Sequence, residues 1–130
     1  MAEVKEQLLY SKEHEWVEVI GERTVRVGIS DFAQNQLGDI VFLELPELGA
    51  QVNPNDSLGS IESVKTVSDL YSPVKGKVTK VNARLLDQPE QVNENPYGNG
   101  WMVEIELEQN VEEALAGLLN AGQYREYTEE

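Results

Sequence analysis

The chain of 130 residues contains no cysteine and only one histidine, His14. The first absence excludes disulfides, thiolate nucleophiles, thiolate zinc sites and protein-ligated iron–sulfur clusters. The second excludes a metal site built from two histidines of one chain, and it leaves His14 alone to serve a serine–histidine–aspartate arrangement. Because His14 stands beside Trp16 at the edge of a predicted strand, we interpret it as a structural imidazole. We therefore predict that the chain is not an enzyme.

Positive charge is also scarce, because 10 lysines and arginines face 24 aspartates and glutamates, for a net charge of −14. Such a surface repels phosphates and anionic lipids, so we predict neither nucleic-acid binding nor membrane docking. The chain has no run of about 18 apolar residues, and its start lacks the apolar core of a secretion signal. We expect a cytoplasmic protein. Many of its acids follow residue 103, and we predict an acidic tail over residues 126–130.

The sequence is rich in short apolar stretches separated by Gly, Pro and Asn, a pattern typical of β-strands. The predicted strands cover residues 16–20, 24–27, 40–45, 57–62, 66–71, 77–81 and 101–107. The stretch 40–45 is apolar enough to be a central strand. We predict an all-β fold, a flattened barrel or sandwich of short antiparallel strands. The length suits a single domain over residues 1–130.

Two segments interrupt the strand pattern. In the first, Asp31 is a predicted N-cap and Gly38 a predicted stop, which indicates a short helix that connects two strands. In the second, Asn110 can cap a helix over residues 111–121, with Gly122 as its stop. Four apolar side chains fall on one face of that helix: Val111, Leu115, Leu118 and Leu119. We expect this C-terminal helix to lie against the sheets.

Lys65 lies where two β-prone runs meet with no Gly, Pro or Asn at the bend. One interpretation is a solubilising charge on a turn. The other is an amine that an acylating enzyme recognises at the tip of a hairpin, where acylation would convert the ammonium to a neutral amide. Strands on both sides would fix the root of that side chain while its long stem moves, as a mobile carrier requires.

Five ordered blocks of the sequence resemble the H-protein family of the glycine cleavage system, over about residues 9–127. The blocks are residues 10–17, 28–42, 44–49, 62–74 and 92–101. The resemblance implies a hybrid lipoyl/biotinyl-type fold with lipoate amide-linked to Lys65. It also implies a carrier without chemistry of its own, which shuttles the aminomethyl group of glycine on the lipoyl arm. The absence of cysteine fits this role, because the reactive sulfurs belong to the cofactor.

The same resemblance implies partners and residue roles. The partners are glycine decarboxylase, aminomethyltransferase, dihydrolipoyl dehydrogenase and a lipoylating enzyme, and we expect a monomer. The segment that lipoylating enzymes recognise matches Glu62, Ser63, Val64 and Val67. Glu15 and Asp69 match acidic positions near the cleft where the arm rests, and their carboxylates could hold the ammonium of the cargo. The alternative is that both are surface acids at strand ends.

Three positions depart from the family pattern. Some members carry His at the positions of Phe32 or Gln36, and Ser at the position of Glu13. These departures argue against a cleft assisted by a histidine or a hydroxyl group at those positions.

Other functions stay open at this stage. An H-like protein could mainly relay lipoate to other acceptor proteins. A biotin carrier is disfavoured because Val64 and Thr66 stand where that family has methionines. A lipoyl domain of a 2-oxo acid dehydrogenase is disfavoured because Asp commonly precedes its lysine. An unmodified binding module would require Lys65 to stay a free amine.

Overall fold

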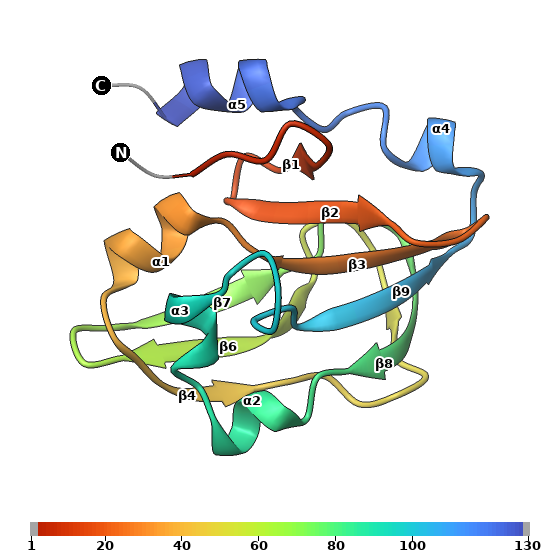
Figure 1. The fold of residues 1–130 in the computed structure, drawn as a ribbon. Helices are drawn as coiled ribbons and strands as arrows, with labels where there is room; N and C mark the ends of the chain where they lie inside the picture. Colours follow the sequence, from red (N-terminus) through yellow and green to blue (C-terminus); the bar gives the residue numbers. More distant parts are fainter. Residues whose placement is uncertain (1–2, 129–130) are drawn as a thin grey trace.

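The computed structural model describes residues 3–128, which fold into two stacked antiparallel sheets (Figure 1). Within these residues the larger sheet holds, in spatial order, β1 (Leu9–Tyr10), β2 (Glu15–Val19), β3 (Thr24–Ile29), β9 (Val103–Leu107), β8 (Gly76–Val81) and β5 (Gln51–Val52). The smaller sheet holds, in spatial order, β4 (Ile40–Glu44), β6 (Ser57–Ser63) and β7 (Val67–Tyr71). The predicted all-β sandwich is confirmed, and the strands of residues 3–128 form no closed barrel.

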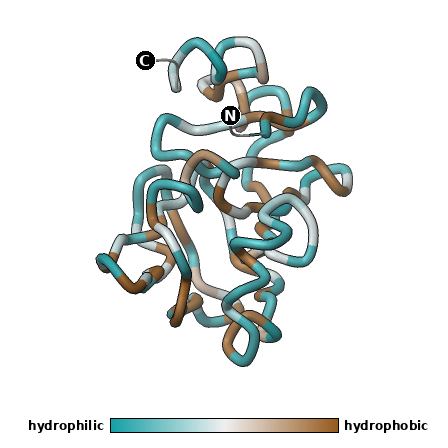
Figure 2. Tube along the Cα trace, turned by 60° about the vertical axis from the view of Figure 1, so that its left-hand side comes forward, coloured by the Kyte–Doolittle hydropathy of each residue, from teal (hydrophilic) through white to brown (hydrophobic). Residues whose placement is uncertain are grey.

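The main core lies between the two sheets, because alternate residues of a strand point to the same face. Val25 pairs with Ile105 and Val27 with Val103, and all four side chains are fully buried. In the smaller sheet Leu43 likewise points toward the space between the sheets and is buried. Figure 2 shows the resulting alternation of hydrophobic and hydrophilic stretches along the chain. Burial of each such side chain contributes roughly 1.5–3 kcal/mol to folding.

A second core lies on the outer side of the larger sheet, under the N-terminal segment and the C-terminal helix (Figure 1). Its centre is Trp16, which is fully buried and donates from Nε1 to the carbonyl oxygen of Pro96 at 2.8 Å. Gly28 stands opposite Trp16 in the β2–β3 pair. A Cβ atom there would lie 2.7 Å from Trp16 Cζ2, so only glycine leaves room for the indole.

The connecting helix is present as α1 (Asp31–Leu37), but its N-cap is Ser30 and not Asp31. The Ser30 Oγ accepts a hydrogen bond from the Ala33 amide at 3.2 Å, while Asp31 is already helical. Gly38 ends the helix with a φ of 84°, a conformation that favours glycine. The loop after β8 also contains two short helices, α2 (Arg84–Asp87) and α3 (Gln91–Glu94).

The prediction of one helix over residues 111–121 is wrong. The structure has α4 (Val111–Ala114) and α5 (Ala121–Thr128), with a non-helical segment between them. In that segment Leu119 and Tyr10 exchange two backbone hydrogen bonds of 2.8 Å. These bonds extend the larger sheet and use the backbone groups that a continuous helix would need.

The end of the chain also differs from the prediction, because a second helix begins there. A new helix begins after Asn120, whose Oδ1 accepts from the Gln123 amide at 2.8 Å. Gly122 therefore lies inside α5 and does not stop a helix. Of the predicted acidic tail, residues 126–128 belong to α5, and residues 129–130 lie outside the described part of the chain.

The prediction of a central strand over residues 40–45 is also wrong, because β4 lies at an edge of the smaller sheet and β6 is the central strand. β4 pairs with β6 alone, and the register shifts between Ile40 and Phe42. Val41 and Phe42 are consequently 47% and 49% exposed. The apolar composition of β4 thus includes side chains that the core does not use.

Candidate functional site

The β6–β7 hairpin presents Lys65 at its tip, where it projects from the sandwich next to α1 (Figure 1). The turn contains no glycine because the buried side chain of Ser63 supplies the missing hydrogen bonds. Its Oγ accepts from the amides of Lys65 at 3.2 Å and Thr66 at 3.1 Å. The Ser63 amide donates to the Thr66 carbonyl oxygen at 2.8 Å. The Lys65 side chain is exposed on a bend that is braced from within.

A second contact fixes the hairpin to the segment after α1. The Val64 amide donates to the Asp39 carbonyl oxygen at 3.0 Å. Beside it, the stem of Lys65 passes over Gly38, and a Cβ atom at Gly38 would lie 3.1 Å from Lys65 Cε. Any larger residue would therefore push the lysine stem aside, in addition to straining the backbone at φ 84°. Gly38 forms a cradle for the aliphatic part of the side chain.

A cavity of about 280 Å³ opens beside this hairpin, between α1, the β2–β3 pair and β6–β7. Leu37, the residue before the Gly38 cradle, lines it, and so does Ser68 on β7. At about 3.3 Å per residue, Ser68 lies roughly 10 Å along the strand from Lys65. The cavity is thus within reach of a long group attached to the lysine nitrogen.

Glu15 is the buried acid of this cavity, with only 2% of its surface exposed. The Ser11 hydroxyl donates to its Oε1 at 2.6 Å, and the Glu15 amide donates back to the Ser11 Oγ at 3.1 Å. None of the ion pairs formed by residues 3–128 includes Glu15. Burial, reinforced by the nearby charge of Glu13, raises the pKa of Glu15 to about 8, against the opposing effect of the Ser11 hydrogen bond. The Glu15 carboxyl is therefore protonated at neutral pH.

Asp69 lines the same cavity at its solvent-facing rim. The Tyr71 hydroxyl donates to its Oδ2 at 3.3 Å, and the charge of Asp69 raises the pKa of Tyr71. The structure thus brings Glu15 and Asp69, which are 54 positions apart in the sequence, to one cavity as one buried and one exposed acid. The alternative that both are surface acids does not hold for Glu15.

His14 also lines the cavity and is held from the C-terminal side of the molecule. Its backbone has a φ of 71°, and its Nδ1 lies 2.8 Å from the Tyr124 hydroxyl of α5. That hydroxyl lies 2.7 Å from the Ser30 Oγ, the N-cap of α1. Burial lowers the pKa of His14, against the opposing charge of Glu13. Sequence reasoning gave His14 a structural role and overlooked Tyr124, because the contact joins residues 110 positions apart.

Phe32, Gln36 and Glu13, the three positions that depart from the family pattern, all line this cavity. The hydroxyl group that contacts the buried acid comes from Ser11 instead. The remaining predicted recognition residues lie at the tip of the hairpin or next to it. Glu62 is exposed, and Val64 and Val67 are 67% and 64% exposed.

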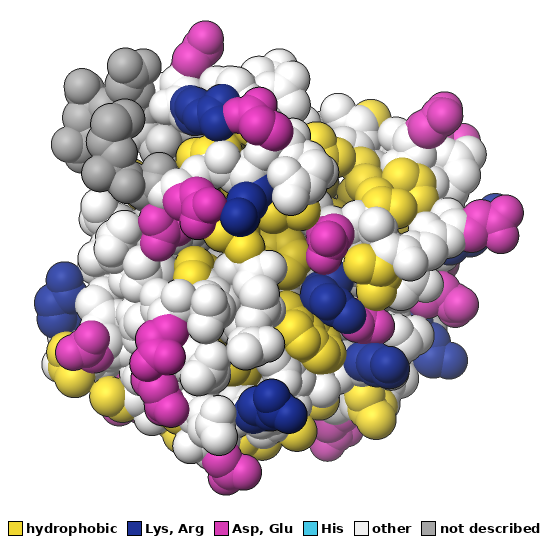
Figure 3. All heavy atoms as spheres, viewed as in Figure 1, with side chains coloured by type: hydrophobic (Ala, Val, Ile, Leu, Met, Phe, Trp, Pro, Cys, Tyr) yellow, Lys and Arg dark blue, Asp and Glu magenta, His cyan; other side chains and the backbone are white. Residues whose placement is uncertain are grey.

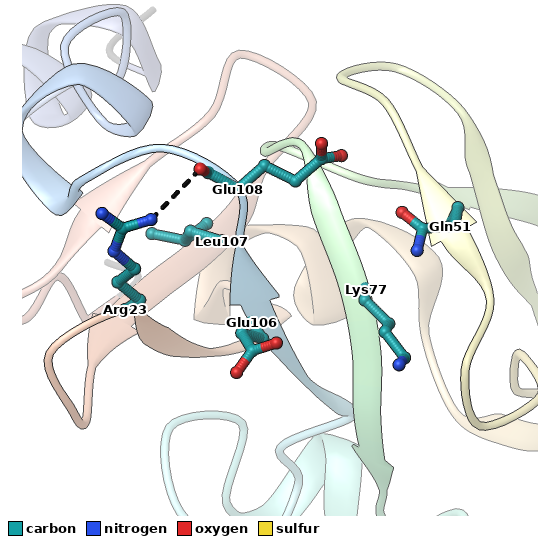
Figure 4. Close-up of a pocket in the computed structure, with 6 residues that line it drawn as sticks. All are labelled: Arg23, Gln51, Lys77, Glu106, Leu107 and Glu108. Atoms are coloured by element: carbon teal, nitrogen blue, oxygen red, sulfur yellow. Dashed lines mark hydrogen bonds between the residues drawn. The ribbon is translucent and has the colours of Figure 1, made fainter.

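A larger depression of about 490 Å³ lies away from Lys65, over β8, β9 and β5. Figure 4 shows that the side chains around it spread outward and do not converge on one point. Arg23 donates to the Glu108 carbonyl oxygen at 3.3 Å, which leaves no convergent set of donors for a ligand. In residues 3–128 no group of three or more His, Asp or Glu side chains could hold a metal ion. No helix in the described part of the chain is long and apolar enough to cross a membrane.

In this fold, a small sandwich of two β-sheets holds a lysine at the tip of a braced hairpin, beside a cavity that the lysine's own arm could enter. The fold and the site together define a carrier domain of the lipoyl type.

Comparison with known proteins identifies the family. A sequence profile described as "Glycine cleavage H-protein" matches residues 8–130. The chain is 55% identical to a glycine cleavage system H protein of Geobacillus sp. (strain WCH70) over 124 residues, 95% of each chain. It is 56% identical to that of Anoxybacillus flavithermus over 123 residues, 95% of this chain and 94% of the other.

The fold leads to the same family. A crystal structure of a glycine cleavage system H protein from Mycobacterium marinum superimposes with a TM-score of 0.86 at 36% identity, covering 95% of this chain and 97% of that one. The chain belongs to the glycine cleavage H-protein family. Its role as a carrier in glycine cleavage follows from this membership, which does not favour the lipoate-relay alternative.

Proposed function

We propose that lipoate is attached by an amide bond to the Nζ of Lys65, and that the chain acts as a carrier without catalysing a step itself. The observation that carries the proposal is the exposed amine at the tip of a hairpin that Ser63 and the Asp39 carbonyl brace. A fixed root with a free end is what an acylating enzyme needs to reach the nitrogen and what a mobile arm needs afterwards.

The residues present fit a lipoyl group. The Gly38 cradle leaves room for the lysine stem, and Leu37 and Phe32 offer apolar contacts inside the cavity. The bound lipoyl group would supply the sulfur that carries the aminomethyl unit. The side chains of this chain would orient the arm and shield its cargo from water.

The attachment can be tested by intact mass and peptide mapping after incubation with a lipoate ligase, ATP and lipoate. We expect one lipoyl group per chain, on Lys65, and none on a Lys65→Arg variant. Lys77→Arg is the matched control, because Lys77 is also exposed but lies on β8 of the other sheet. Equal modification of Lys65→Arg and the wild type would refute the assignment.

For the cavity we propose that Glu15 and Asp69 hold the ammonium of the aminomethyl cargo. The Glu15 carboxyl is protonated at pH 7 because its pKa is about 8. An ammonium in the cavity favours the ionised form, so entry of the cargo would release a proton from Glu15. In this partly desolvated space the resulting ion pair is stronger than in water, and water reaches the cargo less easily.

This guarding role has its own test. A double variant, Glu15→Gln with Asp69→Asn, should shorten the lifetime of the loaded carrier about tenfold, the loss of roughly one charge-assisted hydrogen bond. Lipoylation of Lys65 should be unaffected. The control is Glu106→Gln with Asp87→Asn, two exposed acids that do not line the cavity. An unchanged lifetime would remove the guarding role and leave the carrier role intact.

The partners we propose are glycine decarboxylase, aminomethyltransferase, dihydrolipoyl dehydrogenase and the lipoylating enzyme. The acidic surface, with a net charge of −14, supports protein partners with basic surfaces and opposes nucleic acids and anionic membranes. The named relatives are bacterial, which supports the cytoplasm as the compartment. We propose a single domain and a monomer, for which light scattering and one cooperative unfolding transition are the tests.

A further inference from the structure

The outer face of the smaller sheet carries an exposed row of two apolar side chains with an acid between them, near Lys65. The register pairs Phe42 on β4 with Glu62 on β6, and Glu62 with Val67 on β7. Because paired residues of neighbouring strands point to the same face, these three side chains lie side by side across the sheet. Phe42 is 49% exposed and Val67 64% exposed. We call Phe42, Glu62 and Val67 the outer row.

The outer row is not a consequence of filling the core. The next residue on each neighbouring strand, Leu43 on β4 and Ile61 on β6, points inward and is buried. Exposed phenylalanine and valine side chains on either side of Glu62 cost solubility, and apolar side chains gathered on a surface mark a contact site. Val64, which is 67% exposed at the hairpin tip, extends the apolar surface toward Lys65.

Acids outnumber bases in the segment that carries the outer row, although Arg84 of α2, which packs against β4, adds a positive charge nearby. From residue 38 to residue 72 the chain has six acids, Asp39, Glu44, Glu47, Asp56, Glu62 and Asp69, and one base, Lys65. Asp39 immediately precedes β4 and Glu44 is its last residue, and both are exposed. Figure 3 shows hydrophobic, acidic and basic side chains together at the left edge, where Figure 1 places this hairpin. A complementary partner therefore presents an apolar centre with a basic rim.

We propose that the outer row is a docking surface for the enzyme that acylates Lys65, an inference that rests on the proposed lipoylation of this lysine. Acylation takes place at the lysine nitrogen, so the acylating enzyme must cover the residues around the hairpin tip. Enzymes that react with the far end of the arm can stay further away. The new element is β4, because Phe42 contributes to recognition of a lysine 23 positions later in the sequence.

The docking serves the transfer of a lipoyl group to Lys65. The Nζ of Lys65 attacks the carbonyl carbon of an activated lipoyl ester or mixed anhydride that the enzyme supplies. A C–N bond forms, and the bond from that carbon to the leaving group breaks with its electron pair. The ammonium nitrogen loses two protons in total, one before attack and one as the amide forms.

The test is lipoylation kinetics of the full-length apo chain with a purified lipoate ligase, ATP and lipoate, followed by intact mass. Phe42→Thr, which keeps the β-propensity of the strand, should raise the KM for the apo chain about fivefold or more with kcat little changed. Phe42→Leu should restore most of the loss. The matched control is Val19→Thr on β2, because Val19 is 47% exposed but lies on the other sheet.

Binding without chemistry provides a second readout. In a Lys65→Arg background, where acylation should not proceed, Phe42→Thr should weaken binding of the ligase by the same factor as in the kinetic assay. Glu62→Gln should flatten the salt dependence of that binding, because it removes an acid from the contact.

The outcomes separate the two proposals. If Lys65→Arg is still lipoylated to wild-type extent, the site assignment fails. If Lys65→Arg is inert but Phe42→Thr binds and reacts like the wild type, the docking surface alone is wrong. Equal losses in Phe42→Thr and Val19→Thr would also overturn it. Thermal melting of every variant shows whether a loss reflects unfolding, and a melt unchanged from the wild type assigns the loss to the contact.

Discussion

Two glutamates among the described residues are buried, and their surroundings differ. Glu104 on β9 is 6% exposed, and its Oε2 accepts from Arg26 Nε at 3.1 Å and from Nη2 at 2.8 Å. Glu15 is 2% exposed and accepts from the neutral Ser11 hydroxyl. Its pKa is raised to about 8, mainly by burial. One acid is neutralised by a fixed partner, and the other is neutralised by a proton.

The difference separates a structural acid from a candidate functional one. A paired carboxylate in a sheet holds two strands together and has no free capacity for a ligand. An unpaired buried carboxyl costs free energy when it ionises, and it keeps the capacity to pair with a cation that arrives later. This is why the cavity at Glu15, and not the larger depression over β8, β9 and β5, is the better candidate site.

The largest expected effect comes from removing the partner of Glu104, which leaves this buried acid unpaired, as Glu15 is. Arg26→Met removes the cation beside Glu104 and the contact of the guanidinium with the Trp101 ring, 4.8 Å away. We expect the free energy of unfolding in urea to fall by about 3 kcal/mol at pH 8, because a buried charge loses its partner. Glu106→Gln, at the exposed position two residues along β9, should change stability by less than about 0.5 kcal/mol, and equal losses in both variants would contradict the assignment.

A smaller effect follows from removing the proton that neutralises Glu15. Between pH 4.5 and pH 8 the folded chain keeps that proton and the unfolded chain does not, so the unfolding free energy falls as pH rises through this range. Glu15→Gln cannot lose a proton. We expect it to be more stable than the wild type at pH 8.5, and similar to the wild type in stability below pH 4.5. Urea titrations at both pH values check this, and parallel pH profiles would show that Glu15 is not buried as a neutral acid.

The smallest effect concerns the support of the cavity from α5. Tyr124→Phe removes the hydroxyl that lies between His14 Nδ1 and Ser30 Oγ. We expect a loss of about 1 kcal/mol of unfolding free energy, since the buried Ser30 hydroxyl and the half-buried His14 imidazole lose a partner. The His14 proton resonances in NMR should shift, while those of Trp16, in the same second core, should stay. A shift at Trp16 of the same size would mean that the variant disturbs the whole core.

The sequence predicted the strands well because their signal is local. Ser57–Ser63 and Val67–Tyr71 were predicted within one residue, since alternating apolar residues and turn residues lie inside each segment. The C-terminal helix was predicted wrongly because Leu119 pairs with Tyr10, a contact that no local pattern contains. The position of β4 was wrong for the same reason, because composition does not tell an edge strand from a central one.

The two buried glutamates show most clearly what the local sequence does not predict. In the sequence Glu104 belongs to an acidic run that reads as solvent-exposed, and Glu15 resembles any acid at the start of a strand. Their burial depends on which strands lie beside them, which only the packing of the two sheets decides. The interpretation of Glu15 as a cleft residue came from the resemblance to a family and not from its local sequence.

By itself, the sequence determined the short strands, the single lysine at an uninterrupted bend and the absence of groups for thiol or two-histidine chemistry. Each of these depends on neighbours along the chain or on composition. The tertiary structure decided that Leu37, Glu15 and Asp69 share one cavity, that Gly38 cradles the lysine stem and that Phe42 lies beside Glu62. Proximity and burial are properties of packed surfaces, so the charge state of Glu15 and the apolar face beside Lys65 exist only once the sheets have stacked.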